Sequence, residues 1–237
     1  VVKLYLKYGI QKVEAAAFTQ ITLPLVYYRL KGLKKDYKGN IVCDHMVLAK
    51  VSRPEVAEEF MRPAPERIVY KLLDQGLITQ EEALLSRTVP MSQDICVEAD
   101  SGGHTDGGIA LVLLPSVQSL RDEIQEEYEY DGSIRVGLAG GIGTPQAVAS
   151  AFIMGADFIL TGSINQCTVE AGISDTVKNI LQEINVQDTA YAPAGDMFEI
   201  GARVQVLKKG VLFAARANKL YQLYQQYNSL EEIPQKV

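Results

Sequence analysis

Short apolar runs that end in glycine-rich or polar loops, with helical patterns between them, recur between Val13 and Gln166. Such runs are typical of buried strands, and strands that alternate with helices predict a parallel sheet with helical crossovers. The runs are 13–18, 41–51, 95–99, 134–139 and 158–160. The sequence therefore predicts an α/β fold. The loops of unusual composition all follow strands, on the functional face of α/β barrels.

The loop 100–108, directly after the run 95–99, has the most unusual composition in the chain. It packs four glycines, two aspartates, a serine, a threonine and His104 into nine positions. Glycine lets a backbone approach a ligand closely, because it has no Cβ to hold the ligand off. Imidazole is suited to proton transfer near neutral pH. From this stretch alone, a plain glycine-rich turn with a solvated histidine is an equal alternative.

Lys50 lies near the end of the run 41–51, where burying an ammonium group is costly without a partner. It either faces a ligand at the carboxyl end of a strand, or reaches solvent, or pairs with a carboxylate.

Residues 64–87 predict a pair of helices, and Thr79 and Glu82 have the spacing of a capping box. We interpret this pair as an insertion, which is either a surface decoration or a lid or substrate-docking element.

Two more loops, 140–143 and 161–163, follow consecutive strand-like runs. Backbone N–H groups from two such loops, with a helix N-terminus behind one of them, form an anion site. In (β/α)8 barrels the phosphate site is commonly formed by the loops after strands seven and eight. On that reading the ligand carries a phosphate. A Rossmann fold is disfavoured, because Pro145 and Gln146 stand where a third glycine is needed.

Charge and cysteine content exclude several classes of function. The net charge is −6 and no basic cluster lies among aromatic residues, so we expect no nucleic-acid partner. The cysteines, Cys43, Cys96 and Cys167, are too few and scattered for a disulfide framework or a zinc site, which predicts a cytoplasmic protein without a metal. No signal peptide or apolar span of membrane length is present. The chain opens without methionine, inside an amphipathic segment, which predicts that it is part of a longer polypeptide.

Several strings of residues resemble a known family. The runs 97–104 (Val-Glu-Ala-Asp-Ser-Gly-Gly-His), 139–142 and 160–163 are similar to the flavin-dependent (β/α)8 barrels of the nitronate monooxygenase and enoyl reductase superfamily. The longer strings 47–54, 98–106, 161–167 and 192–198 resemble one branch of it. That branch comprises the trans-acting enoyl reductases of polyunsaturated fatty acid synthases and of bacterial trans-acyltransferase polyketide synthases.

The resemblance implies a (β/α)8 TIM barrel, of which this chain carries strands four to eight. Residues 1–63 and 90–237 would be the C-terminal part of an FMN-binding barrel, and 64–89 the helical insertion. The catalytic residues implied are His104 and Lys50. The residues implied to bind the cofactor are Gly140, Gly141, Gly162 and Ser163 at the FMN phosphate, and Ser101, Gly102 and Gly103 against the flavin ring.

The reaction implied is reduction of an enoyl thioester on an acyl carrier protein. NADPH gives a hydride to the flavin, the flavin passes it to the β-carbon, and an acid protonates the α-carbon. His104 would be that acid or would polarise the thioester carbonyl, and Lys50 would stabilise anionic reduced flavin. The implied partners are components of polyketide or fatty acid synthases, with a homodimer as one expected assembly.

Three alternatives stay open at this point. A nitronate monooxygenase would use the same histidine to abstract a proton and would need no NADPH. A phosphate-sugar barrel enzyme would use Lys50 to form a Schiff base. A non-catalytic domain of a megasynthase would bind flavin without turnover.

Overall fold

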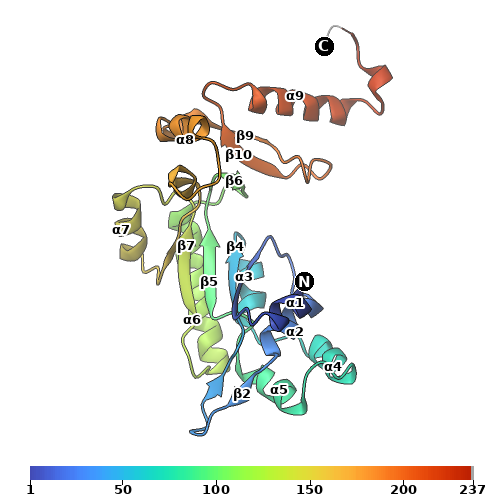
Figure 1. Ribbon diagram of the computed structural model, residues 1–237, viewed down its shortest axis with the longest axis vertical. Helices are drawn as coiled ribbons and strands as arrows, with labels where there is room; N and C mark the ends of the chain where they lie inside the picture. The colour runs from blue at the N-terminus through green and yellow to red at the C-terminus, as the bar shows by residue number, and fades with distance from the viewer. Residues whose placement is uncertain (236–237) are drawn as a thin grey trace.

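The computed structural model describes residues 1–235 and is built around a sheet of five parallel strands. The strand order is β1–β4–β5–β7–β8, so each strand lies beside the next one in the chain that belongs to this sheet. The strands are β1 (Lys12–Ala16), β4 (Met46–Val51), β5 (Asp94–Glu98), β7 (Arg135–Ala139) and β8 (Ile159–Leu160). The sheet curves into half of a barrel (Figure 1), which confirms the predicted α/β fold and partial TIM-like barrel.

Helices connect the strands and cover one face of the sheet. They are α2 (Leu23–Leu30), α3 (Pro54–Met61), α6 (Ala110–Tyr128) and α7 (Pro145–Ile153), whereas α1 (Val2–Lys7) precedes β1 and packs near α2. Local signals set where some of them begin. Pro54 and Pro145 occupy first helical positions, where proline's missing N–H costs nothing. Thr144 caps α7 by accepting a hydrogen bond from the Ala147 N–H at 3.2 Å.

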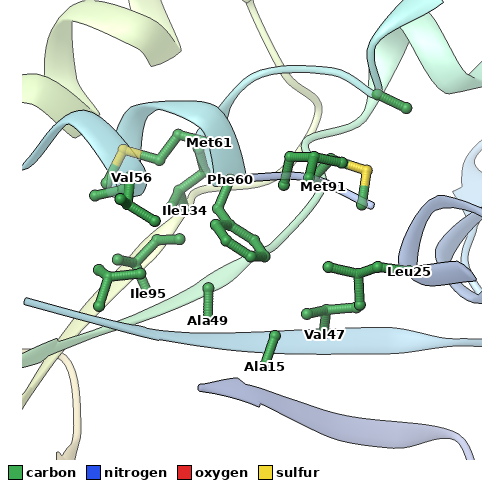
Figure 2. Packing of buried hydrophobic residues seen from close by; sticks show 14 of the residues in the cluster. Ala15, Leu25, Val47, Ala49, Val56, Phe60, Met61, Met91, Ile95 and Ile134 are labelled. Atoms are coloured by element: carbon green, nitrogen blue, oxygen red, sulfur yellow. The ribbon is translucent and has the colours of Figure 1, made fainter. Parts of the chain in front are cut away.

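The two faces of the sheet differ because side chains alternate along each strand. Val47, Ala49 and Val51 of β4 are buried beneath α3, where Phe60 points toward Ala49 (Figure 2). The residues between them, Leu48 and Lys50, are only partly buried on the opposite face. In a curved parallel sheet covered by helices outside, this opposite face is the inner one.

The pair of helices expected over 64–87 is present as α4 (Glu66–Asp74) and α5 (Gln80–Leu85), followed by the short 3-10 turn η1 (Ser86–Thr88), and that they form an insertion stays a prediction. Its capping box forms: the Glu82 N–H donates to Thr79 Oγ1 at 3.1 Å, and the Thr79 N–H donates to Glu82 Oε2 at 2.7 Å. The helices pack near α2 at the amino ends of the strands, opposite to the loop 100–108 (Figure 1). They therefore do not cover that loop, and a docking function for them stays a prediction.

The run 41–51, expected as one strand, is divided in the structure. β3 (Ile41–Val42) pairs antiparallel with β2 (Lys34–Lys35), and β4 begins only at Met46. The break is held by polar contacts that apolar periodicity does not show. Lys34 Nζ lies 3.0 Å from Asp44 Oδ2, and His45 Nδ1 lies 2.5 Å from the Lys31 carbonyl oxygen.

A second sheet lies beyond the carboxyl ends of the strands and was not expected from the sequence. It joins β6 (Gly103–His104), β10 (Arg203–Leu207) and β9 (Thr189–Pro193) in antiparallel pairs. Around it lie η2 (Ser163–Cys167), α8 (Asp175–Gln182), η3 (Val186–Asp188), α9 (Phe213–Gln226) and η4 (Leu230–Glu232). The segment 189–202 begins as strand β9.

Two tyrosines of α9 pack against Phe198, in the loop between β9 and β10. The rings of Tyr221 and Tyr224 lie 5.2 Å and 5.4 Å from the ring of Phe198, both edge-on. Among residues 1–235, no helix is both long enough and apolar enough to cross a membrane.

Candidate active site

The loops after β5, β7 and β8 converge at the carboxyl end of the sheet. A Cβ added to Gly140 would lie 2.6 Å from the Ala99 carbonyl oxygen, and one added to Gly102 would lie 2.5 Å from Ser163 Oγ. The glycines therefore let three loops approach one another closely. Of the residues that the resemblance implies for the cofactor, Gly102 lies against Ser163, and Gly140 lies against the start of the loop that holds Ser101 and Gly103. Gly141 and Gly162 are the chain neighbours of Gly140 and Ser163.

Two of these loops present backbone N–H groups that the chain itself does not use. Among residues 1–235, the N–H groups of Gly141, Gly162 and Ser163 donate no hydrogen bond to another backbone group. A Cβ at Gly141 or Gly162 would meet nothing within 4 Å, so the space beside them is open. The N-terminus of α7 begins directly behind, at Pro145. Free N–H groups at a helix N-terminus suit an anion, and these residues fit a phosphate group.

Asp100 anchors the loop 100–108 to the hairpin formed by β9 and β10. Its carboxylate accepts hydrogen bonds from Tyr191 Oη, from Gln205 Nε2 at 3.0 Å and from Thr105 Oγ1 at 2.9 Å. The Thr105 N–H also donates to the Arg203 carbonyl oxygen at 3.2 Å. The hairpin therefore clamps the loop that carries His104, a function that the sequence reasoning missed.

His104 contacts Asp196, which lies in the loop between β9 and β10. His104 Nε2 is 2.9 Å from Asp196 Oδ1, and the two side chains are 50% and 65% exposed. The hydrogen bond from His104 holds the pKa of the Asp196 carboxyl below its usual range. The string 192–198 marked this segment as typical of the family, but nothing local in it pointed to a partner for His104.

Lys50 lies on the inner face of the sheet between two carboxylates. Its Nζ is 3.3 Å from Glu98 Oε1 on β5 and 3.5 Å from Glu14 Oε1 on β1. Burial works against the charge on Lys50, but the attraction of Glu98 and Glu14 outweighs it and raises the pKa. Lys50 is therefore cationic at neutral pH and unsuited to form a Schiff base, which needs a neutral amine.

Glu98 links Lys50 to the candidate cofactor loop. Ser101 Oγ donates to Glu98 Oε1 at 3.3 Å, so the lysine acts on the loop through a carboxylate. No hydrogen bond or ion pair joins Lys50 to His104 within the described residues. Glu14 and Glu98 are functional candidates that the sequence reasoning missed, and only strand register places them beside Lys50.

The loop after β4 is joined to the loop after β5 through Asp106. Arg53 Nε lies 3.1 Å from Asp106 Oδ2, and Ser52 Oγ donates to the same oxygen at 2.5 Å. The hydrogen bonds from Arg53 and Ser52 lower the pKa of the Asp106 carboxyl. Two strings that carried the family resemblance, 47–54 and 98–106, therefore contact each other in the structure.

Comparisons with known proteins identify the relatives of this chain. It is 61% identical over 236 residues to the polyketide biosynthesis protein PksE of Bacillus subtilis, covering 100% of this chain and 31% of that protein. It is 48% identical over 235 residues to one of the polyunsaturated fatty acid synthase subunits of a Thraustochytrium species, covering 98% of this chain and 16% of that relative. No family model matches the chain.

Solved structures agree with these relatives. The crystal structure of the enoyl reductase domain of MlnA, from the macrolactin biosynthesis cluster of Bacillus amyloliquefaciens, superposes with a TM-score of 0.95 at 48% identity. It is matched over 99% of this chain and 53% of that one. FabK from Thermotoga maritima superposes with a TM-score of 0.60 at 20% identity, and the match covers 95% of this chain and 55% of the FabK chain. At that identity the likeness shows the fold alone.

These matches confirm the resemblance to the trans-acting enoyl reductase branch that the sequence motifs indicated. The chain spans about a third or less of the curated relatives described above, and about half of the matched MlnA chain.

Proposed function

We propose that this chain, a homologue of polyketide biosynthesis proteins and polyunsaturated fatty acid synthase subunits, carries the His104 site of an FMN-dependent enoyl reductase. The substrate is an enoyl thioester on an acyl carrier protein, and the reductant is NADPH. The observation that supports this most is the convergence of the three glycine loops beside His104, in a fold shared with an enoyl reductase domain.

The fit of FMN to these residues rests on the open backbone cradle. Gly141, Gly162 and Ser163 would bind the phosphate through their free N–H groups, with Gly140 and the N-terminus of α7 behind them. Ser101, Gly102 and Gly103 would lie against the ring, because a glycine backbone leaves room for a flat group. FMN bound there would supply hydride transfer between NADPH and the β-carbon of the substrate.

His104 would complete the reduction by handling the proton. Its imidazole either donates a proton to the α-carbon or donates a hydrogen bond to the thioester carbonyl oxygen. The side chain is half exposed, so it can exchange protons with solvent between turnovers.

Lys50 would orient the loop 100–108 and would not stabilise the negative charge of a reduced cofactor. The group formed by Lys50, Glu14 and Glu98 has a formal charge of −1, since one cation faces two carboxylates. The ion pair between Lys50 and Glu98 orients the Glu98 carboxylate, which accepts the hydrogen bond from Ser101 Oγ. We therefore propose that Lys50 positions the loop against which the flavin ring lies.

A nitronate monooxygenase is the second candidate, because the same exposed histidine could abstract a proton from a nitroalkane carbon. The chain's homology with synthase proteins favours the reductase. A third candidate is a domain that binds flavin in the same cradle but catalyses no reaction.

The deciding experiment is an absorption spectrum of the purified protein, followed by anaerobic addition of NADPH and then crotonyl thioester. A reductase shows flavin bands that NADPH bleaches and the enoyl thioester restores. Bands that NADPH does not bleach would favour the monooxygenase, and bands that bleach without restoration would favour the non-catalytic domain. A protein without bands, even after reconstitution with FMN, would contradict the proposed cradle.

A further inference from the structure

The contact between His104 and Asp196 fixes which imidazole nitrogen carries the proton. Because Asp196 has a lowered pKa, its side chain is a carboxylate at neutral pH and can only accept a hydrogen bond. His104 Nε2, at 2.9 Å, must therefore donate. In the neutral imidazole this leaves Nδ1 as an unprotonated acceptor.

We propose that Asp196 is a positioning residue that holds His104 in the Nε2–H tautomer and orients its ring. His104 then has a single ring nitrogen, Nδ1, free to exchange a proton with a substrate. The catalytic half of this inference rests on the proposed reductase function, whereas the tautomer does not.

The proton balance follows from this geometry. Addition of hydride at the β-carbon leaves a thioester enolate, whose α-carbon takes the proton from Nδ1–H of the imidazolium. The N–H bond at Nδ1 breaks, a C–H bond forms, and the neutral imidazole keeps its Nε2–H on Asp196. A proton from solvent then restores the imidazolium, since His104 is half exposed.

The surroundings of His104 leave Asp196 as its one ionic partner among the described residues. On the strand of His104 and its loop, Asp100 is bound by Tyr191 and Gln205, and Asp106 by Arg53. Arg203 on β10 lies over the Tyr191 ring at 5.2 Å. Glu98 on β5 faces Lys50. The opposite charge that acts directly on the imidazole therefore comes from the hairpin.

Asp196 is far from His104 in the sequence, and the hairpin of β9 and β10 brings the two side chains together. Val204 of β10 pairs with His104, and the Ala194 N–H donates to the Ala202 carbonyl oxygen at 2.7 Å across the base of the hairpin loop. The loop therefore brings a carboxylate to the imidazole as a consequence of strand pairing.

The tautomer can be measured directly, because the chain has only two histidines. His45 Nδ1 faces the Lys31 carbonyl oxygen and must donate, so His45 is the opposite tautomer and an internal control. Long-range proton–nitrogen NMR spectra of 15N-histidine-labelled protein should show Nε2–H for His104 and Nδ1–H for His45. In Asp196→Ala only the His104 signals should change, toward a mixture of tautomers. An unchanged His104 pattern would overturn the proposal.

Kinetics test the catalytic half. Asp196→Asn keeps an oxygen that accepts from Nε2–H, so the tautomer and most of kcat should persist. Asp196→Ala should lower kcat about 10- to 100-fold, a part of the effect of positioned proton transfer, with little change in KM. Asp196→Glu should partly restore kcat.

Glu199→Gln, an exposed charge change in the same loop, is the matched control and should keep the wild-type kcat and KM. A wild-type kcat in Asp196→Ala would overturn the catalytic role while the NMR result still decides the tautomer. If the wild-type protein reduces no enoyl thioester, the proposed function fails, and the spectra alone judge the contact.

Discussion

Adjacent glycines in the loop after β7 meet different surroundings. Both Gly140 and Gly141 have positive φ, at +90° and +71°, a region that other residues adopt only with strain. A Cβ at Gly140 would also lie 2.6 Å from the carbonyl oxygen of Ala99 and 2.8 Å from that of Asp100, whereas a Cβ at Gly141 would meet nothing within 4 Å. Only Gly140 is required for the close approach of two loops.

Gly140→Ala should therefore destabilise the protein more than Gly141→Ala. Each substitution should lower the free energy of unfolding by about 1–3 kcal/mol, because alanine is strained at a positive φ. At Gly140 the clash of the added methyl group with the backbone increases this loss. Free energies of unfolding in urea measure the difference. Equal losses of stability in the two variants would contradict the convergence of the loops after β5 and β7.

At the scale of elements, the hairpin of β9 and β10 organises the carboxyl end of the sheet. It pairs with β6, it supplies Tyr191 and Gln205 to Asp100, and it carries Asp196. The loop 100–108 contains four glycines and has little side-chain packing of its own. The ordering of His104 therefore depends on an element that follows it by about 90 residues in sequence.

Tyr191→Phe should loosen this clamp without unfolding the sheet, because it removes one donor to Asp100 and leaves Gln205 and Thr105 in place. We expect faster amide hydrogen exchange across residues 100–106 and unchanged exchange in β4 and β5. Tyr224→Phe, on α9 away from Asp100, is the control. Unchanged exchange in the loop would show that the hairpin does not hold it.

At the scale of the whole molecule, helices cover one apolar face of the half-barrel and leave charge on the other. Lys50, Glu14 and Glu98 lie on the inner face, with Cys96 beside them in the register of β4 and β5. Burial raises the pKa of the Cys96 thiol from 9.0 to about 12. Burial also raises the pKa of the Tyr130 and Tyr28 hydroxyls above their usual value.

These raised values predict a loss of stability in alkali. The folded state keeps the Cys96 proton up to about pH 12, while the unfolded state loses it near pH 9.0. The stabilisation is therefore complete below pH 9.0 and declines as the pH rises toward 12. Unfolding free energies measured between pH 8 and 10.5 should fall, and less steeply in Cys96→Ala. An identical slope in that variant would assign the loss to other groups.

The sequence alone determined the five parallel strands, the helices between them and the position of the glycine loops after the strands. These follow from signals within a few residues: apolar periodicity, prolines at helix starts, the Thr79–Glu82 capping box and the glycine-rich composition of residues 100–108. The strings that resemble the family added the expected roles of these loops in cofactor binding and of His104 in catalysis.

Only the tertiary structure decided which groups face each other. Asp196 lies 92 residues from His104 and Gln205 lies 105 residues from Asp100, and no local pattern encodes either contact. Glu14 and Glu98 reach Lys50 because three strands pair in one register, which depends on packing across the whole sheet. Local periodicity determines which residues form a strand, whereas long-range pairing determines the charge around His104 and Lys50.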